Sequence, residues 1–257
     1  MRTEAVAGTQ TVRRAVLILK AFTDAQPAWG LSDLARMVGL NKTTTYRLLA
    51  ALEAEAMVAR DREGDQYRLG PEAIALGGRA LRSNTLRLAS RSELEALART
   101  TGETATLEVL AGSETLILDE VPGQHLVGTQ PSIGTRWPVN TTSTGKAILA
   151  FLSDAERNTA LPRRLPAPMP KSISDRGELF AELARVRTRG YAVQFEELED
   201  DFAAVGAPIF NHAGRVTAAV SVGGPSRRLP QARLRELAPA VQATAGRISA
   251  GLGYREG

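Results

Sequence analysis

A helix whose first turn holds three consecutive threonines is the feature that most constrains this chain. Residues 40–52, LNKTTTYRLLAAL, have the leucine spacing of an α-helix, yet Thr43, Thr44 and Thr45 stand together near its start. Each β-branched threonine costs up to about 0.7 kcal/mol relative to alanine inside a helix. Folding alone gives little reason for such a run, so we expect this end of the helix to meet another molecule.

The neighbouring segments predict a winged helix-turn-helix. A first helix begins at Val12, and its expected buried stripe is Val12, Ala15, Val16, Leu19 and Phe22. The segment DAQPAWG (24–30) breaks it. Ser32 then starts a second short helix, with Leu34, Ala35 and Val38 inward, which Gly39 ends. Asn41 is the expected N-cap of the third helix, and residues 57–70 predict a hairpin around Gly64.

The helical period divides the third helix into two faces. Leu48, Leu49 and Leu52 define the buried face, and Thr45 falls on the same side. Thr43, Arg47, Ala50 and Ala54 point away, with Lys42, Thr44 and Tyr46 on the flanks. The N-terminal residues of such a helix read base edges in the major groove, where threonine offers a hydroxyl and a methyl and arginine can bind guanine. We predict that DNA is contacted by Lys42, Thr43, Thr44, Tyr46 and Arg47. The alternative is a solvated face with no partner.

Charge and composition narrow the class of protein. Residues 1–100 hold 15 basic and 11 acidic residues, whereas residues 101–257 hold 17 of each, so the whole net charge of +4 lies in the first part. Such asymmetry favours a polyanion as partner of that part. The chain has no cysteine, which excludes disulfides and thiol catalysis, and its two histidines show no metal-ligand spacing. No apolar run approaches the roughly 18 residues of a membrane span, so we expect a cytoplasmic protein.

The remainder predicts an α+β domain with a mostly antiparallel sheet flanked by helices. The chain is expected to be helical from Pro71 to about Thr100, where two chains could join. Strands are expected at TATLEVL, TLILDEV, HLVGTQ, YAVQF, FAAVGAPIF and RVTAAVSVGG, and helices at STGKAILAFL, after Asp175 and from about Leu229 to Leu252. We expect a flexible tail over 1–10, the winged domain over 11–70, a linker helix over 71–90 and the α+β domain over 91–257.

Taken in order, these segments resemble the IclR family of bacterial transcriptional regulators. The N-terminal resemblance lies in TVRRAVLILKAF, LSDLARMVGLNKTTTYRLLAAL and YRLG, and the C-terminal one in TGETATLEVL, NTTSTGKAILAFL, ARVRTRGYAV, GAPIF and GRVTAAVSVGGPSRRL. The resemblance implies a GAF-like C-terminal domain that binds a small organic or aromatic acid, without a further cofactor. It also implies homodimers or dimers of dimers on palindromic operators of catabolic operons, with either sign of regulation.

The segment TTSTGKAIL (141–149) is the expected effector site. A nucleotide-binding P-loop is excluded, because Asn140 and Ala147 stand where that loop needs glycine and Ser or Thr. Hydroxyl residues and Gly145 at a helix start can instead cradle a carboxylate on backbone N–H groups, although a plain helix cap would look the same. The resemblance favours the ligand site, and the effector-binding residues that it implies are Thr142, Ser143, Thr144, Gly145, Gln194 and Ala204. Val139 and Phe202 are expected to supply apolar walls.

Two charged features remain near this site. Lys146 is expected to be at the surface or in a salt bridge. The run EELEDD (196–201) could bind a metal, but a solvated loop between strands is the simpler interpretation, since no histidine lies nearby in sequence.

The leading hypothesis is therefore a ligand-responsive DNA-binding regulator. An enzyme is the first rival, but the chain has no cysteine nucleophile, no G-x-S-x-G elbow and no paired histidines. The second rival is a sensor whose N-terminal domain mediates only protein contacts, against which the outward Thr43 and Arg47 argue.

Overall fold

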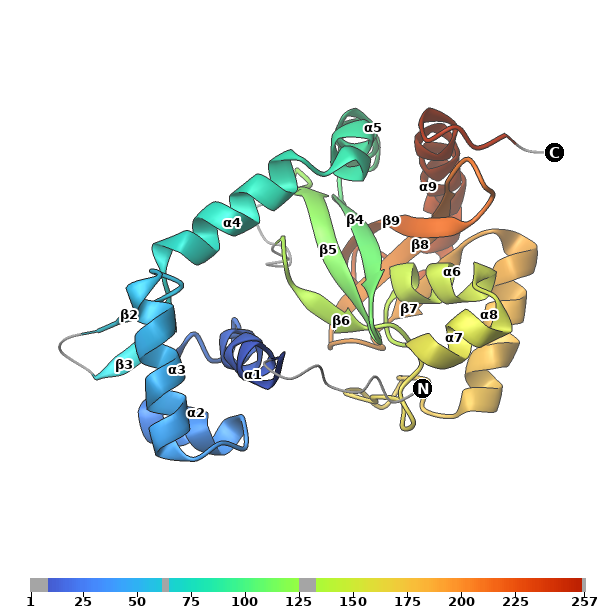
Figure 1. Cartoon of the computed structure of the whole chain (residues 1–257). Coiled ribbons are helices and arrows are strands. Elements are labelled where there is room, and N and C mark those ends of the chain that lie inside the picture. The colour runs from blue at the N-terminus through green and yellow to red at the C-terminus, as the bar shows by residue number, and fades with distance from the viewer. Residues whose placement is uncertain (1–8, 62–64, 125–132, 256–257) are drawn as a thin grey trace. The chain divides into compact units, whose positions relative to one another are not determined.

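The computed structural model describes residues 9–61, 65–124 and 133–255 (Figure 1). The chain divides into two compact units, Met1–Ser83 and Asn84–Gly257. The expected α+β class, with a helix-turn-helix unit followed by a unit built on an antiparallel sheet, is confirmed. The expected strand HLVGTQ (125–130) lies outside the described residues.

The first unit contains four helices and a small sheet among its described residues. The helices are α1 (Thr9–Lys20), α2 (Leu31–Met37), α3 (Lys42–Ala54) and α4 (Pro71–Arg82). The strands β1 (Ala28–Gly30), β2 (Val58–Arg60) and β3 (Gln66–Leu69) form an antiparallel sheet in the order β1-β3-β2. The predicted hairpin is confirmed as β2 and β3, but β1 was not expected. It forms because Trp29 donates its indole N–H to the Ala21 carbonyl oxygen at 2.8 Å and pairs with Tyr67 across the sheet.

The predicted buried stripe of α1 is right for Ala15, Leu19 and Phe22 and wrong for Val12 and Val16. Ile18 is the fully buried residue, with Ala15 and Leu19 packed beside the same core, whereas Val12 and Val16 are 65% and 43% exposed. Several apolar residues follow one another in VLIL, so periodicity alone fits more than one face of the helix. The helix also begins at Thr9, so the last two residues of the expected tail belong to it.

The second unit is a six-stranded antiparallel sheet with helices beside it. The strands are β4 (Thr104–Ala111), β5 (Glu114–Val121), β6 (Arg136–Pro138), β7 (Ala192–Phe195), β8 (Phe202–Phe210) and β9 (Val216–Pro225), in the order β6-β5-β4-β9-β8-β7. The helices α5 (Thr85–Thr101) and α9 (Gln231–Gly251) pack together, and α6 (Ser143–Phe151) packs with α8 (Arg176–Arg189). Figure 1 shows these two pairs on opposite sides of the sheet.

Strand register decides which residues face α6. Gly206 of β8 pairs with Ser221 of β9, which pairs in turn with Thr106 of β4, so the three share one face. Gly206 has no side chain between the sheet and the helix: a Cβ there would lie 3.1 Å from the Ser143 hydroxyl oxygen. The start of α6 therefore lies directly against β8.

Two further expectations about helices are corrected. The single helical stretch from Pro71 is two helices, because Asn84 ends the run and caps α5 by accepting a hydrogen bond from the Arg87 backbone N–H at 3.0 Å. Helix α7 (Asp154–Ala160) was not expected, although Ser153 and Glu156 form a complete capping box at its start.

Candidate functional site

The exposed face of α3 is built as its sequence predicts. Asn41 caps the helix, since its side-chain oxygen accepts a hydrogen bond from the Thr44 backbone N–H at 2.8 Å. Thr45 is buried with Leu48 and Leu49, and its hydroxyl donates to the Asn41 carbonyl oxygen at 3.0 Å. The predicted outward residues Thr43, Arg47, Ala50 and Ala54 are all exposed. Of the flanking residues, Lys42 and Tyr46 are exposed and Thr44 is half-buried.

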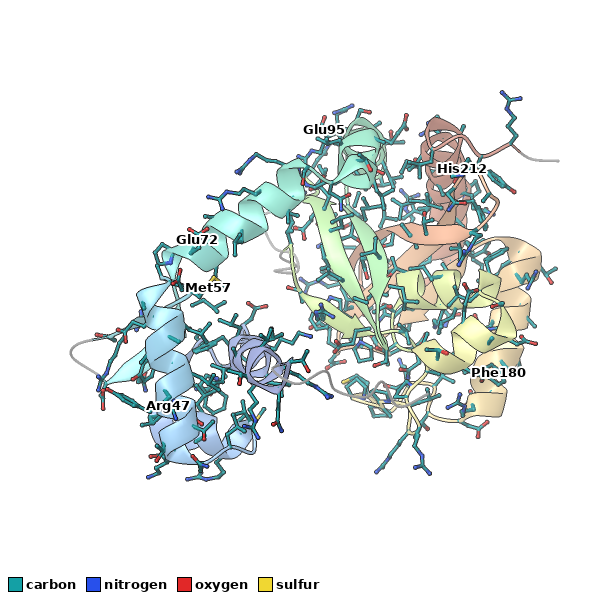
Figure 2. The ribbon with its side chains drawn as sticks, in the orientation of Figure 1. Arg47, Met57, Glu72, Glu95, Phe180 and His212 are labelled. Carbon is teal, nitrogen blue, oxygen red and sulfur yellow. The ribbon has the colours of Figure 1, made fainter. Side chains whose placement is uncertain are left out.

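Two basic side chains on this face have no carboxylate partner in the described structure. Lys42 and Arg47 form no ion pair with a described residue, and Arg47 projects from α3 in Figure 2. Arg36, Arg60, Arg68 and Arg79 of the first unit are paired with carboxylates, whereas Arg13, Arg14, Lys20 and Arg82 share the lack of an ion pair with a described residue. The positive charge of α3 is thus available to an outside anion such as a phosphate.

The second unit contains a partly open cavity of about 200 Å³ between the start of α6 and the sheet. Its walls come from all six strands β4 to β9, from the start of α6 and from the segment between β7 and β8. The lining residues are Thr104, Thr106, Glu108, Ile117, Trp137, Thr142, Ser143, Thr144, Gln194, Leu198, Glu199, Phe202, Ala204, Ser221 and Gly223. A mostly apolar wall with a few convergent polar groups is typical of a small-molecule site.

The structure brings five of the six predicted effector residues to this cavity. Thr142, Ser143, Thr144, Gln194 and Ala204 line it, and so does the expected apolar residue Phe202. Gly145 does not. Its backbone N–H donates to the Thr142 hydroxyl oxygen at 3.0 Å, and its Cα faces the Val139 carbonyl. Gly145 therefore serves the close packing of α6, and Val139 is buried without lining the cavity.

Gln194 lines the cavity and carries a buried hydrogen-bond acceptor. Its amide nitrogen donates to the Phe202 carbonyl oxygen at 3.3 Å, and this acceptor fixes the orientation of the amide group. The side-chain oxygen of Gln194 is buried and has no hydrogen-bond partner among residues 9–61, 65–124 and 133–255. A buried polar atom without a partner costs about 1–3 kcal/mol, so this oxygen calls for a donor.

Glu108 is the buried carboxylate among the nine lining residues that sequence reasoning missed. It lies on β4, and its carboxylate accepts hydrogen bonds from the Thr144 hydroxyl at 2.6 Å and the Thr106 hydroxyl at 3.1 Å. Burial raises the pKa of Glu108, and these hydroxyl donors oppose the rise. The only sequence signal for Glu108 was its position as an acidic residue in the otherwise mostly apolar strand TATLEVL. A strand with one face in solvent would explain such a residue equally well.

Lys146 and Glu197 form a buried ion pair beside the cavity. Lys146 is not at the surface: it is 1% exposed, and its ammonium donates to both carboxylate oxygens of Glu197 at 2.6 Å. The expected salt bridge is therefore present, but it is buried. Residues 196–201 are not simply a solvated loop, because Glu197 and Leu198 are buried. In the described part of the chain, no group of three or more potential ligands could hold a metal ion.

Comparison with known proteins identifies the family. The family model for the IclR helix-turn-helix domain matches residues 11–62, and the model for the bacterial transcriptional regulator IclR C-terminal domain matches residues 78–250. The HTH-type transcriptional regulator XynR of Escherichia coli K12 is 31% identical over 246 residues, which cover 95% of this chain and 98% of that protein.

Solved structures agree with this assignment. The IclR transcriptional regulator from Alicyclobacillus acidocaldarius is 30% identical, with a TM-score of 0.83 over 95% of this chain and 99% of that one. An IclR homologue from Microbacterium hydrocarbonoxydans, solved with 4-hydroxybenzoate, is 25% identical, with a TM-score of 0.78 over 94% and 98%. This chain belongs to the IclR family, and it is a transcriptional regulator with a helix-turn-helix DNA-binding domain and an effector-binding C-terminal domain.

Proposed function

We propose that the protein controls a catabolic operon by binding a palindromic operator through α3 and a small organic or aromatic acid in the cavity behind α6. DNA binding is assigned to residues 11–70, coupling to the linker at 71–90 and ligand binding to residues 91–257. The observation that carries the DNA assignment is the exposed, carboxylate-free pair Lys42 and Arg47 beside Thr43 and Thr44. The ligand assignment rests on the cavity and on the 4-hydroxybenzoate held by one homologue. The site of action of such a regulator is the cytoplasm.

An Arg47→Ala variant is expected to weaken operator binding by about 1–3 kcal/mol, because a base or phosphate contact is lost. Fluorescence anisotropy with a labelled operator fragment at fixed salt measures this change. Arg233→Ala, which removes an exposed arginine of α9, is the matched control and should bind the operator like the wild type. Unchanged affinity of the Arg47 variant would refute the proposed orientation of α3 on DNA.

A Ser143→Leu variant is expected to lose the ligand response while keeping its basal operator affinity. Ser143 lines the cavity, is 2% exposed and faces Gly206, so a leucine would fill the space at the start of α6. Operator binding measured with and without ligand tests this, since a ligand shifts a conformational equilibrium only if it binds. A normal response in this variant would place the ligand elsewhere.

The proposed palindromic operator requires paired recognition helices, separated by about 34–36 Å or a multiple of one turn. We therefore expect a homodimer or a dimer of dimers. Sedimentation velocity at micromolar concentration should show no stable monomer, and a monomer that still binds a palindromic site would contradict this expectation.

Neither rival function has a specific observation in its favour. An enzyme is not favoured by the comparisons, since both matching family models describe domains of a transcriptional regulator. No helix among the described residues is long and apolar enough to cross a membrane.

A further inference from the structure

The ionisable groups that line the cavity are acidic. Glu108 lies at the sheet and Glu199 in the segment after β7, and no lysine, arginine or histidine lines the cavity within the part of the chain that the structure describes. A carboxylate bound beside Glu108 would meet a like charge at short range, which costs free energy unless a proton or a cation lies between them. A positive group on the bound acid would offset this repulsion.

The acceptors of the cavity lie beside the donors at the start of α6. Ser143 and Thr144 are the first two residues of α6, and no described residue accepts a hydrogen bond from their backbone N–H groups. The same Thr144 donates its hydroxyl to Glu108 at 2.6 Å. Thr144 therefore links the backbone N–H donors, which suit a carboxylate, to the carboxylate of Glu108, which suits a cation.

A second acceptor belongs to a residue that lines the same cavity. Gln194 is 1% exposed, and its side-chain oxygen has no partner among the described residues, with its orientation fixed by the Phe202 carbonyl. Glu108 and Gln194 together call for a ligand group that donates more than one hydrogen bond. An ammonium group has three donors and a charge that offsets the burial of a carboxylate. Trp137, Ile117 and Phe202 leave an apolar space for the rest of the ligand.

We infer that the effector is an α-amino acid, or a close analogue with carboxylate and ammonium on one carbon. Its carboxylate accepts from the backbone N–H groups of Ser143 and Thr144, its ammonium donates to Glu108 and Gln194, and its side chain lies against Trp137 and Phe202. Thr144 connects the two groups, since its backbone N–H is one of the donors and its hydroxyl donates to Glu108 at 2.6 Å. The inference rests on the proposed function, since it names the ligand class of the same cavity.

The test compares matched ligands on the full-length protein. The probes are the twenty common amino acids. Each is compared with its deaminated acid, which lacks the α-amino group, and with its decarboxylated amine, which lacks the α-carboxylate. Binding is measured by thermal shift and then by calorimetric titration. At least one amino acid should bind, and its deaminated acid should bind roughly 10–100-fold more weakly, which corresponds to the loss of charge-assisted hydrogen bonds. Glu108→Gln should remove most of this discrimination, and Glu236→Gln, at an exposed position of α9, should keep it.

A second variant guards against misfolding of the Glu108 variant. Gln194→Met keeps the side-chain length and removes the acceptor, so it should weaken amino-acid binding about tenfold and leave the deaminated acid unaffected. The inference is overturned if no amino acid binds, or if a deaminated acid binds as tightly as its parent. Operator binding is measured on the same samples. A deaminated acid that shifts operator affinity would leave the proposed function standing without the inference, whereas failure to bind any operator DNA would remove the proposed function alone.

Discussion

Lys146→Met is expected to lower the free energy of unfolding by about 3–5 kcal/mol, because it leaves the carboxylate of Glu197 buried without its cation. The two side chains are 1% and 12% exposed, and both carboxylate oxygens accept from the same ammonium at 2.6 Å. Burial lowers the pKa of Lys146 and raises that of Glu197, so each charge depends on the other. Urea unfolding followed by circular dichroism measures the change.

The chain offers two matched comparisons for this variant. Lys171→Met removes a half-exposed lysine that pairs with Glu196, the residue before Glu197. This variant should lose no more than about 1 kcal/mol of unfolding free energy. Combining Lys146→Met with Glu197→Leu removes both charges and should recover most of the lost stability. If the single Lys146 variant unfolds at the same urea concentration as the wild type, the ion pair is accessible to water in solution and the prediction is wrong.

The same ion pair has a consequence for the cavity. Glu197 directly precedes Leu198 and Glu199, which line the cavity, and Lys146 belongs to α6, which forms the opposite wall. The pair therefore holds two walls of the ligand site together. We expect the Lys146 variant to weaken ligand binding as well, whereas the Lys171 variant should not.

Gly145→Ala is the second substitution with a large expected effect, a loss of about 3 kcal/mol at the upper end of the usual cost of overpacking. A Cβ at this position would lie 2.2 Å from the Val139 carbonyl oxygen and 2.7 Å from the Thr142 hydroxyl oxygen. The nearest atom is backbone, so a rotamer change cannot relieve the clash. The same urea unfolding experiment measures the loss.

Gly246→Ala provides the contrast for this prediction. Gly246 lies inside α9, and a Cβ there would meet nothing within 4 Å. Alanine should stabilise that helix by about 0.5–1 kcal/mol, because it loses less conformational freedom on folding than glycine does. Opposite signs for the two variants would show that close packing, and not helix propensity, decides position 145. A neutral Gly145 variant would contradict the tight approach of α6 to residue 139.

Features that depend on neighbours in the sequence were predictable. The N-cap at Asn41 and the buried side of α3, with Thr45 beside Leu48 and Leu49, follow from a helical period over thirteen residues. The start of α6 at Ser143 follows from the small-residue turn before it, and most of the strands follow from short apolar runs between turn residues. Five of the predicted effector residues line the cavity because they belong to such local elements or match positions of the family pattern.

Features that depend on register between distant strands were decided only by the tertiary structure. Glu108 meets Thr144 from 36 positions away, and Lys146 meets Glu197 from 51, so no local pattern distinguishes either residue from an ordinary surface charge. The burial of Ile18 in α1 was likewise decided by packing. The run VLIL has apolar side chains in several directions, and only the contacts with the core formed by α2 and α3 show which of them is buried. Periodicity specifies which residues of an element share a face, but what that face meets depends on contacts between segments far apart in the chain.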